Sequence, residues 1–425
     1  MVSCGGRHYD GAVAVLPGNK PVVAPVDELT VGVNEKKKKE RIKVMKRRFL
    51  FRTTLMAGAA LAAATMLSGT SMAKDQGRFA TFLSPKNPVV EYGAVPFMKR
   101  VEKDSKGDLS FKLYAGGSLL GGKNMVQGLR DGVADIGQIV FGYYPAEFPY
   151  ASLIADMAIY GSYPPAISAA VTEFNFLHCK GCLEDYKRNG LVVLGSASTS
   201  TYELLGKEDV SKVESLKGMK VRAAGALWAR WLNYVGAIPV SMPSSEMYES
   251  LSRGQVDVVM QPLGAMKSHS IWDIAHKATM LDLGTYRSWG IFSVSAKYWA
   301  TLSVPEREIL MKNAAIGLID TSKGYMAKDE EVLKMAKEKH VELIQPSEGL
   351  RKSVTDFLKS DRATVIETAK TKYKIADPEP LMDTLIALIE KWEKKFAPIK
   401  DDNKAMSDML WNEVLSKVDV KTLGN

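Results

Sequence analysis

Histidine and cysteine are scarce in this sequence, with five histidines and three cysteines among 425 residues. No H-E-x-x-H, no G-x-S-x-G and no metal-spaced set of these residues occurs, so the local signatures of zinc and serine hydrolases are missing. No apolar run reaches about 20 residues without a polar interruption, which argues against a polytopic membrane protein. The ordinary hydrophobic fraction of 46% excludes a disordered or disulfide-dense chain. A globular protein of roughly two or three domains remains.

The region from Met45 to Ala73 has the pattern of an export signal. A basic start at residues 46–48 precedes the apolar stretch 55–64, and Ser71-Met72-Ala73 is a small-x-small cleavage pattern. We expect cleavage after Ala73, with an uncleaved membrane anchor as the alternative. Residues 1–44 have no clear place before a signal peptide. We expect them to be upstream DNA read as protein, or else a disordered basic tail.

The positive charge of the chain belongs to this leader. Of the 57 Lys and Arg and the 48 Asp and Glu residues, 12 and 5 precede residue 74, which leaves 45 and 43 and a net charge of +2. No basic groove with interleaved aromatic residues is left in the mature part. The sequence therefore predicts no nucleic-acid partner.

The two cysteines after the leader form the motif Cys179-Lys180-Gly181-Cys182. Because an exported protein meets an oxidising compartment, we expect a short-loop disulfide between Cys179 and Cys182. A redox pair and a pair of metal ligands are the alternatives. Leu183 follows the second cysteine in place of histidine, which excludes a haem attachment motif.

Strand-like and helix-like stretches alternate after the leader, which predicts an α/β architecture with largely parallel sheets. Ser303 and Glu306, with Pro305 between them, form a capping box that opens a long helix to about Lys339. The last 80 residues are mostly helical. The expected strands are 79–83, 109–114, 134–140, 192–195, 202–205, 220–222, 238–240, 255–260 and 292–295.

A glycine-rich stretch from Gly117 to Asn124 approaches the phosphate-binding pattern G-x-x-x-x-G-K-[ST] between an expected strand and an expected helix. Asn124 stands where that pattern requires a Ser or Thr hydroxyl for Mg²⁺. We therefore expect a turn that needs glycine, and no nucleotide site.

The most informative stretch, residues 216–262, contains LKGMKVR at 216–222, GAIPV at 236–240, PSSEMYESL at 243–251 and GQVD at 254–257. Together these motifs resemble the solute-binding proteins of TRAP (tripartite ATP-independent periplasmic) transporters. The resemblance extends over most of residues 78–395.

This resemblance implies a two-lobed α/β clamshell of the periplasmic-binding-protein type, with a long helix spanning both lobes and a helical C-terminal region. The solute is expected in the cleft between the lobes, where hinge closure buries it. We expect the first lobe at 74–197 with about 287–325, the second at 198–286 with about 326–395, and a C-terminal extension at 396–425.

In the family, the arginine of the LKG-x-K-x-R motif pairs with the carboxylate of the solute, and Arg222 is the matching residue. A planar guanidinium binds a carboxylate through two parallel hydrogen bonds, which fixes orientation as well as charge. The alternative is a surface arginine paired with an acidic side chain. Gln261, before Pro262, replaces the family's usual Asn and reaches one methylene further. Met260-Gln261 does not fit the Glu-Trp of relatives that bind 2-oxo acids through a metal, so no metal is expected.

Aromatic residues are expected at the cleft edges, although each one taken alone is more often a core residue. Residues 198–202 lack the additional Arg of sialic-acid binders, so a sialic acid is not expected. The aromatic residues concerned are Phe82, Phe141, Tyr143, Tyr144, Trp228 and Trp289. The full set of expected ligand contacts is Arg222, Gln261, Trp289, Tyr143, Thr199, Asn124 and Trp228.

The sequence therefore predicts a periplasmic receptor, not an enzyme, that binds a small organic carboxylate and delivers it to TRAP membrane permease subunits. No cofactor is expected, and the chain is expected to be a monomer. A periplasmic enzyme using the same cleft is one alternative, and a binding protein for an ATP-driven transporter or a sensor is another. The identity of the carboxylate stays open.

Overall fold

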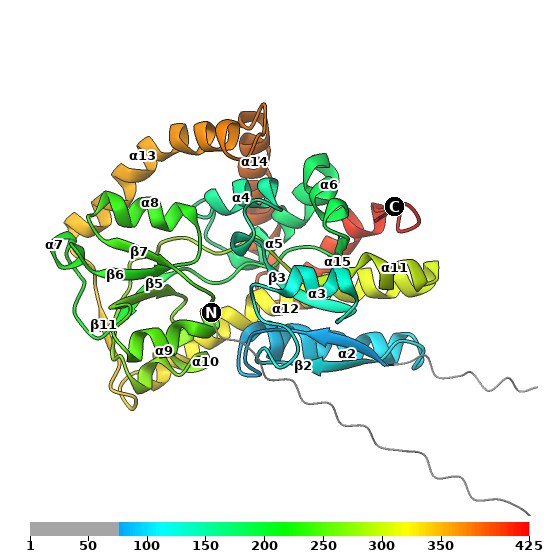
Figure 1. Cartoon of the computed structure of the whole chain (residues 1–425), viewed down its shortest axis with the longest axis horizontal. Helices are drawn as coiled ribbons and strands as arrows, with labels where there is room; N and C mark the ends of the chain where they lie inside the picture. The colour runs from blue at the N-terminus through cyan, green and yellow to red at the C-terminus, as the bar shows by residue number, and fades with distance from the viewer. Residues whose placement is uncertain (1–75, 425) are drawn as a thin grey trace, which may run out of the picture. The chain divides into compact units, whose positions relative to one another are not determined.

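The structure is a computed structural model that describes residues 76–424 (Figure 1). The predicted export signal and the segment 1–44 lie outside the described residues. Within the described range, no helix has both the length and the apolar character needed to cross a membrane.

The first sheet has five strands in the order β2-β1-β3-β10-β4. β1 pairs in parallel with β2 and β3, whereas β10 runs antiparallel to β3 and β4. All seven residues of β10 and all five of β3 are buried, because other elements cover both faces of the central strands. The strands are β1 Gly77–Ala80, β2 Phe111–Tyr114, β3 Ile136–Val140, β4 Leu191–Val193 and β10 Trp289–Ser295.

The second sheet has six strands in the order β11-β9-β5-β8-β6-β7. β6 pairs in parallel with β7 and β8, while β5 runs antiparallel to β8 and β9. The strands are β5 Glu203–Gly206, β6 Lys220–Ala223, β7 Ile238–Ser241, β8 Val258–Gln261, β9 Lys277–Thr279 and β11 Glu342–Ile344.

The predicted α/β class is confirmed, but the sheets are mixed and not largely parallel. The antiparallel pairs all involve β5 or β10. Both strands follow an extended crossing of the chain from the other sheet, whereas β11, which follows the long helix α12 (Val304–Met335), runs parallel to β9. The sequence pattern alone does not show in which direction a strand enters its sheet.

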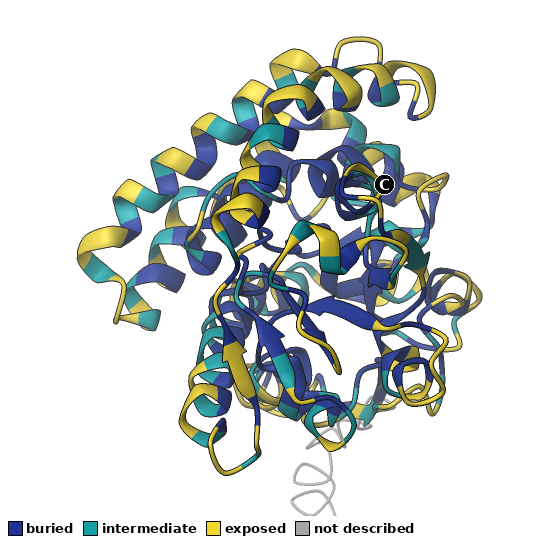
Figure 2. Cartoon of the chain, turned by 90° about the vertical axis from the view of Figure 1, so that its left-hand side faces the viewer, coloured by how far each residue is buried: buried dark blue, intermediate teal, exposed yellow. Residues whose placement is uncertain are grey.

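Helices cover both sheets and have outer faces that are exposed to solvent, drawn in yellow in Figure 2. Three of them, α4, α5 and α6, fall in a stretch where no element was predicted. The main helices are α2 Val95–Asp104, α3 Met125–Asp131, α4 Pro149–Asp156, α5 Pro164–Glu173, α6 Lys180–Arg188, α8 Ala226–Tyr234, α9 Met247–Ser252, α10 Ala265–Ser268, α11 Ala296–Thr301, α12 Val304–Met335, α13 Glu348–Thr371, α14 Glu379–Phe396 and α15 Asn403–Glu413. The shorter helical turns are η1 Val89–Ala94, η2 Phe141–Tyr143, η3 Phe174–His178, α7 Val213–Leu216, η4 Ser244–Glu246, η5 Ile271–Asp273, η6 Ala397–Ile399 and η7 Leu415–Lys417.

The long helix α12 begins at the predicted capping box, in which Ser303 and Glu306 bond each other's backbone N–H groups. It packs against α2 and α5 near the first sheet and against α10 beside the second (Figure 1). A single helix therefore spans both lobes, as expected for the clamshell.

The residue bounds expected for the two lobes stay a prediction. α14, which those bounds assign to the second lobe, packs against α5 within the range expected for the first. In the C-terminal extension, α15 packs against α12, and the tail that follows is held by a bond from Trp299 Nε1 to the carbonyl of Leu423, 2.9 Å.

The predicted disulfide joins Cys179 and Cys182, whose Cα atoms are 5.2 Å apart. The pair sits where α6 begins, and the sulfur of Cys179 accepts a hydrogen bond from the backbone N–H of Cys182. The disulfide therefore closes the first turn of this helix.

The chain passes between the sheets twice in extended conformation, from β4 to β5 and from β9 to β10. The two passing segments are paired, since Thr199 N–H donates to the carbonyl of Tyr286 at 3.0 Å and Tyr202 N–H donates to that of Gly284 at 2.8 Å. Paired extended segments of this kind absorb a hinge rotation through small backbone changes. We refer to them as the crossing segments.

Glu203 starts β5 directly after the first crossing segment, and only 5% of it is exposed. Its carboxylate accepts hydrogen bonds from Asp282 N–H at 3.0 Å and from the Thr201 hydroxyl at 3.1 Å. Burial outweighs these bonds and raises the pKa of Glu203 to about 7. The carboxyl group is therefore protonated in the folded state at pH values where the unfolded chain has released the proton.

The raised pKa predicts a pH-dependent effect of Glu203→Gln. Between the ordinary pKa of a glutamic acid and pH 7, only the folded state binds the Glu203 proton. The stability that this proton contributes at pH 5 is therefore lost as the pH rises through 7. Glutamine keeps both hydrogen bonds, since its oxygen accepts from Asp282 and its amide donates to Thr201. We expect E203Q to match the wild type at pH 5 and to exceed its free energy of unfolding by ~2 kcal/mol at pH 8. Urea denaturation at both pH values measures this, and an equal difference at both would contradict it.

Candidate functional site

A narrow cavity of about 30 Å³ lies between the two lobes, which are in contact around it. At Phe82, Leu83, Ser244 and His269 it meets a wider groove of about 600 Å³. Both lobes and the long helix α12 contribute to its wall. The lining residues are Phe82, Leu83, Asn87, Val140, Tyr143, Thr199, Tyr202, Arg222, Ala224, Ser244, Gln261, His269, Tyr286, Trp289 and Tyr325.

Arg222 lies on β6 and is completely buried. Its Nε and Nη2 atoms donate to the carbonyl of Met242 at 3.1 and 2.9 Å, and its Nη1 atom donates to that of Met260 at 3.5 Å. The bonds to Met242 occupy the Nε edge of the guanidinium and fix its plane. Its Nη1–Nη2 end, where Nη2 also donates to the Tyr143 hydroxyl at 3.3 Å, is then the edge that a carboxylate would approach to accept two parallel hydrogen bonds.

The charge of Arg222 has no carboxylate partner in residues 76–424, and neither Asp nor Glu is among the cavity-lining residues described. A buried guanidinium without a counter-ion costs several kcal/mol in a low-dielectric interior. The alternative from the sequence, a surface arginine paired with an acidic side chain, is therefore wrong. An anion in the cavity would offset the cost.

Arg287 provides a contrast, because it is also completely buried. Its Nη atoms donate to the carbonyls of Tyr160 and Ala158 at 2.5 and 2.6 Å, and to the Thr285 hydroxyl at 2.8 Å. Burial lowers the pKa of Arg287 to about 9. Arg287 does not line the cavity. Its bonds fasten the loop after α4 to a crossing segment, whereas Arg222 lines the cavity.

The Tyr143 hydroxyl reaches across from the first lobe to Arg222. It accepts hydrogen bonds from Arg222 Nη2 at 3.3 Å and from Ser244 N–H at 3.1 Å. Because both bonds use its lone pairs, its own proton is left to donate. A carboxylate beside Arg222 is the strongest acceptor that such a proton could meet.

Three other expected contacts also line the cavity, each differently. Gln261 ends β8, buried and near the Tyr202 hydroxyl. The Thr199 hydroxyl already accepts from Tyr286 N–H and donates to the carbonyl of Ser200, so the backbone uses its proton and one of its two lone pairs. Trp289 donates its indole N–H to the carbonyl of Ala197 at 2.7 Å, which leaves its ring as the part available to a solute.

Two expected contacts, Asn124 and Trp228, are not among the cavity-lining residues. Asn124 is exposed and immediately precedes α3. Trp228 is buried behind the wall, where its ring stacks on Tyr202 at 4.6 Å and its N–H donates to the carbonyl of Leu283. The sequence does not distinguish an aromatic residue at a cleft edge from one that packs behind a cleft residue. Trp228 was therefore expected in the cavity although it packs behind the wall.

The remaining aromatic candidates divide between cavity and core. Phe82 lines the cavity, with its ring 6.0 Å from that of Tyr143. Phe141 packs in the core against Phe148. Tyr144 accepts from Met125 N–H and donates to the carbonyl of Gly122, so it fastens the glycine-rich turn.

Several lining residues were not expected from the sequence. They come from places without a motif: Asn87 precedes η1, His269 follows α10, and Tyr325 lies in the middle of α12. Only the fold brings these positions together. The other polar or aromatic lining residues missed are Tyr202, Ser244 and Tyr286.

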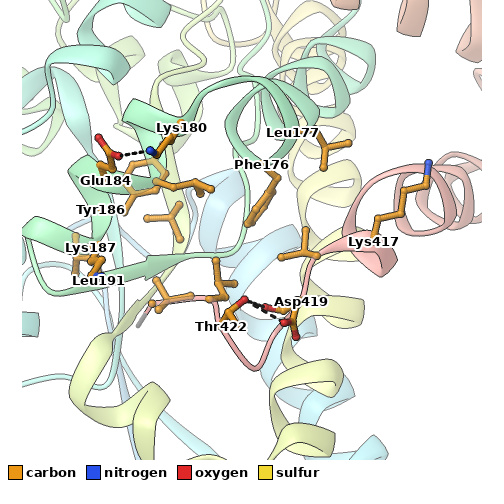
Figure 3. Close-up of a pocket in the computed structure, with 16 residues that line it drawn as sticks. Phe176, Leu177, Lys180, Glu184, Tyr186, Lys187, Leu191, Lys417, Asp419 and Thr422 are labelled. Carbon is orange, nitrogen blue, oxygen red and sulfur yellow. Dashed lines mark hydrogen bonds and ion pairs between the residues drawn. The ribbon is translucent and has the colours of Figure 1, made fainter.

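A second hollow, shown in Figure 3, lies between α6, β4 and the C-terminal tail and has a volume of about 390 Å³. It shares no residue with the arginine cavity. Its walls include Phe176 and Leu183, and Lys180 at its rim is paired with Glu184 at 3.6 Å. It presents no buried, unpaired charge, so the arginine cavity is the better candidate for a functional site.

Comparison with known proteins agrees with this geometry. The DctP model of bacterial extracellular solute-binding proteins, family 7, matches residues 79–367. A solute-binding protein of Albidiferax ferrireducens is 26% identical over 218 residues, which are 51% of this chain. The match covers 63% of that relative, less than two thirds of its length.

Solved structures of TRAP solute-binding proteins have the same fold. One from a marine metagenome, specific for aromatic acids and bound to 3-hydroxybenzoate, is 22% identical with a TM-score of 0.67, covering 75% of this chain and 99% of that one. One from Rhodoferax ferrireducens, with copurified benzoate, is 21% identical with a TM-score of 0.66, covering 76% and 99%. The resemblance predicted from the motifs at 216–262 is confirmed, and this chain belongs to the bacterial extracellular solute-binding proteins of family 7.

Proposed function

We propose that this chain is the extracytoplasmic receptor of a TRAP transporter and binds a small organic carboxylate at Arg222. The observation that carries the proposal is the buried guanidinium, which faces a cavity between two lobes and has no carboxylate partner among residues 76–424. A carboxylate bound there would supply the counter-charge that this desolvated guanidinium lacks. This preorganisation favours binding, because little free energy is needed to orient the arginine.

The interlobe contacts support capture by closure. Besides the bonds of Tyr143, the Ser84 hydroxyl of the first lobe donates to the carbonyl of Ser268 in the second at 3.2 Å. A solute that contacts both lobes would stabilise this closed arrangement over an open one. The receptor would then present the closed form to membrane permease subunits and release the solute there.

We place the mature receptor in the periplasm, released by cleavage after Ala73, and expect it to act as a monomer without a cofactor. Capture and release require no bond-making group. The alternative of an enzyme requires a pair of titratable groups facing the solute. His269 is the lining residue closest to that role, and burial together with the charge of Arg222 lowers its pKa to about 4, which leaves it a weak base.

Related receptors guide the choice of probes. Family-7-like structures have been solved with benzoate, 3-hydroxybenzoate, mandelate, pyroglutamate and galactonate. All five are small carboxylates, so they test the carboxylate class broadly.

The test is calorimetric titration of the refolded, ligand-free mature chain (residues 74–425) with these five acids. We expect at least one to bind and, at a hundred times its dissociation constant, to stabilise the fold by ~2.7 kcal/mol in a thermal melt. The matching uncharged amide of that acid should not bind, since it lacks the charge that Arg222 requires. Equal binding of acid and amide, or no binding of any carboxylate, would overturn the proposal.

A further inference from the structure

A second set of polar side chains lines the cavity. In the described residues, no hydrogen bond joins these side chains to Arg222 or to the partners of Arg222. The set consists of Asn87, His269 and Tyr325, which come from the first lobe, the second lobe and α12. Asn87 is only 2% exposed. The cavity therefore has a charged side, at Arg222, and a neutral polar side, formed by Asn87, His269 and Tyr325.

The amide of Asn87 has a fixed orientation. Its Oδ1 atom accepts from Val89 N–H at 3.0 Å and from the Tyr325 hydroxyl at 3.4 Å. Its Nδ2 atom must then be the group that lies 3.5 Å from His269 Nε2. Because an amide nitrogen only donates, His269 Nε2 accepts and the ring is in its neutral form. The lowered pKa of His269, about 4, agrees with a neutral ring.

These bonds leave one hydrogen-bond donor and one hydrogen-bond acceptor unused. Asn87 Nδ2 has a second N–H, and the Tyr325 oxygen has lone pairs that its own donation to Asn87 leaves free. A hydroxyl group is the small group that accepts one hydrogen bond while donating another. A carboxylate has no proton to donate to Tyr325, and an alkyl group would leave both partners unpaired.

The remaining wall suits a flat ring. Trp289 lies 5.8 Å from Tyr286 and 5.9 Å from Tyr325 between ring centroids, and Phe82 closes another side. The Tyr286 hydroxyl donates to the carbonyl of Ser288 and accepts from Gly142 N–H, so its polar edge is already occupied. The faces of these rings are left for stacking against a solute.

The charge of the lining limits the solute to one carboxylate. Arg222 is the single Lys or Arg among the lining residues that the structure describes, and Lys86 borders the outer groove alone. A second carboxylate in the cavity would be buried without a partner, which is strongly unfavourable.

Resting on the function proposed above, we propose that the solute is an aromatic monocarboxylate with a ring hydroxyl. Arg222 holds its carboxylate, Asn87 and Tyr325 bond the hydroxyl, and His269 holds the Asn87 amide in place. The three residues thereby determine specificity among aromatic acids and add nothing to the recognition of the carboxylate itself.

The test compares benzoate, 3-hydroxybenzoate, 4-hydroxybenzoate and phthalate by calorimetry on the mature wild type and on Tyr325→Phe. We expect one hydroxybenzoate to bind roughly tenfold more tightly than benzoate, because two buried polar groups gain partners. Phthalate should bind at least tenfold more weakly than benzoate. Y325F should reduce the ratio of hydroxybenzoate affinity to benzoate affinity to less than about threefold. Tyr298→Phe, outside the cavity, is the matched control and should leave this ratio as it is in the wild type.

The outcomes separate this inference from the proposed function. Equal or tighter binding of benzoate than of both hydroxybenzoates would overturn the inference, as would an unchanged preference in Y325F. Binding of aliphatic acids such as galactonate, with no aromatic acid bound, would also overturn it while leaving the carboxylate receptor intact. Failure of every carboxylate to bind would overturn the proposed function itself.

Discussion

Replacing Arg222 with alanine is expected to weaken carboxylate binding by at least about a hundredfold. Truncating one partner of a buried, hydrogen-bonded charge pair costs roughly 2–5 kcal/mol, much of it from the charge left without a partner. In R222A a bound carboxylate would be buried opposite carbonyl groups alone, since Met242 and Met260 lose their donor. Calorimetric titration with the acid that binds the wild type most tightly measures the loss.

Two further variants distinguish a loss of carboxylate binding from a loss of folding. Arg222→Lys keeps the charge but loses the fixed fork, so we expect an intermediate loss of about tenfold. Arg253→Ala removes an exposed arginine of the same lobe, paired only with Glu249, and should bind normally. Thermal melts without ligand establish that each variant is folded. A folded R222A with wild-type affinity would show that the carboxylate binds elsewhere.

The largest effect on stability is expected from Arg230→Ala. Arg230 donates to both oxygens of Asp361, at 2.7 and 2.8 Å, and to Asp156 at 2.9 Å. It thereby joins α8 of the second lobe to α13 and to the end of α4 in the first. Burial raises the pKa of Asp156, and Arg230 together with the Tyr373 hydroxyl opposes this shift. Without Arg230, two carboxylates that are 1% and 5% exposed lose their counter-ion. We expect a loss of about 3–5 kcal/mol.

Arg253→Ala is the matched control for this prediction as well. Arg253 and Glu249 form an exposed pair in which the side chains are 69% and 62% accessible. Such pairs contribute little, so the free energy of unfolding should change by less than about 0.5 kcal/mol. Urea denaturation of both variants at pH 7 gives the comparison. Similar small losses in R230A and R253A would mean that the buried network does not hold the lobes and α13 together.

The sequence allowed much of the fold to be predicted, because most strands carried their own apolar pattern and turn residues. The short strands β9 and β11 were not predicted. β6, β7 and β8 lie where the motifs at 216–262 indicated, and the capping box at Ser303 marked the start of α12. The helices α4 to α6 were missed. Their residues are almost all buried in α4 and α5, which removes the one-sided apolar period that identifies an amphipathic helix.

The site could be predicted only where a local motif reported it. Arg222 and Gln261 end up in the cavity because the strands that hold them have a recognisable sequence. Asn87, His269 and Tyr325 are 56 to 238 positions apart in sequence, and their meeting depends on how the lobes and α12 pack. Asn124 follows a turn whose Gly122 lies beside Phe82 and Tyr143, but Asn124 itself is exposed and does not line the cavity. The Arg222 side of the cavity was therefore accessible from sequence, and the side formed by Asn87, His269 and Tyr325 was not.

A crystal structure of the mature protein with the most tightly bound carboxylate tests the central claim most directly. The arrangement described above predicts both carboxylate oxygens within about 3 Å of the Nη atoms of Arg222, with the Tyr143 hydroxyl also in hydrogen-bonding distance. The rest of the solute should lie against Trp289 and point toward Asn87. A carboxylate bound away from Arg222, whether toward Asn87 or in the hollow beside α6, would contradict the assignment of Arg222 as the anchor.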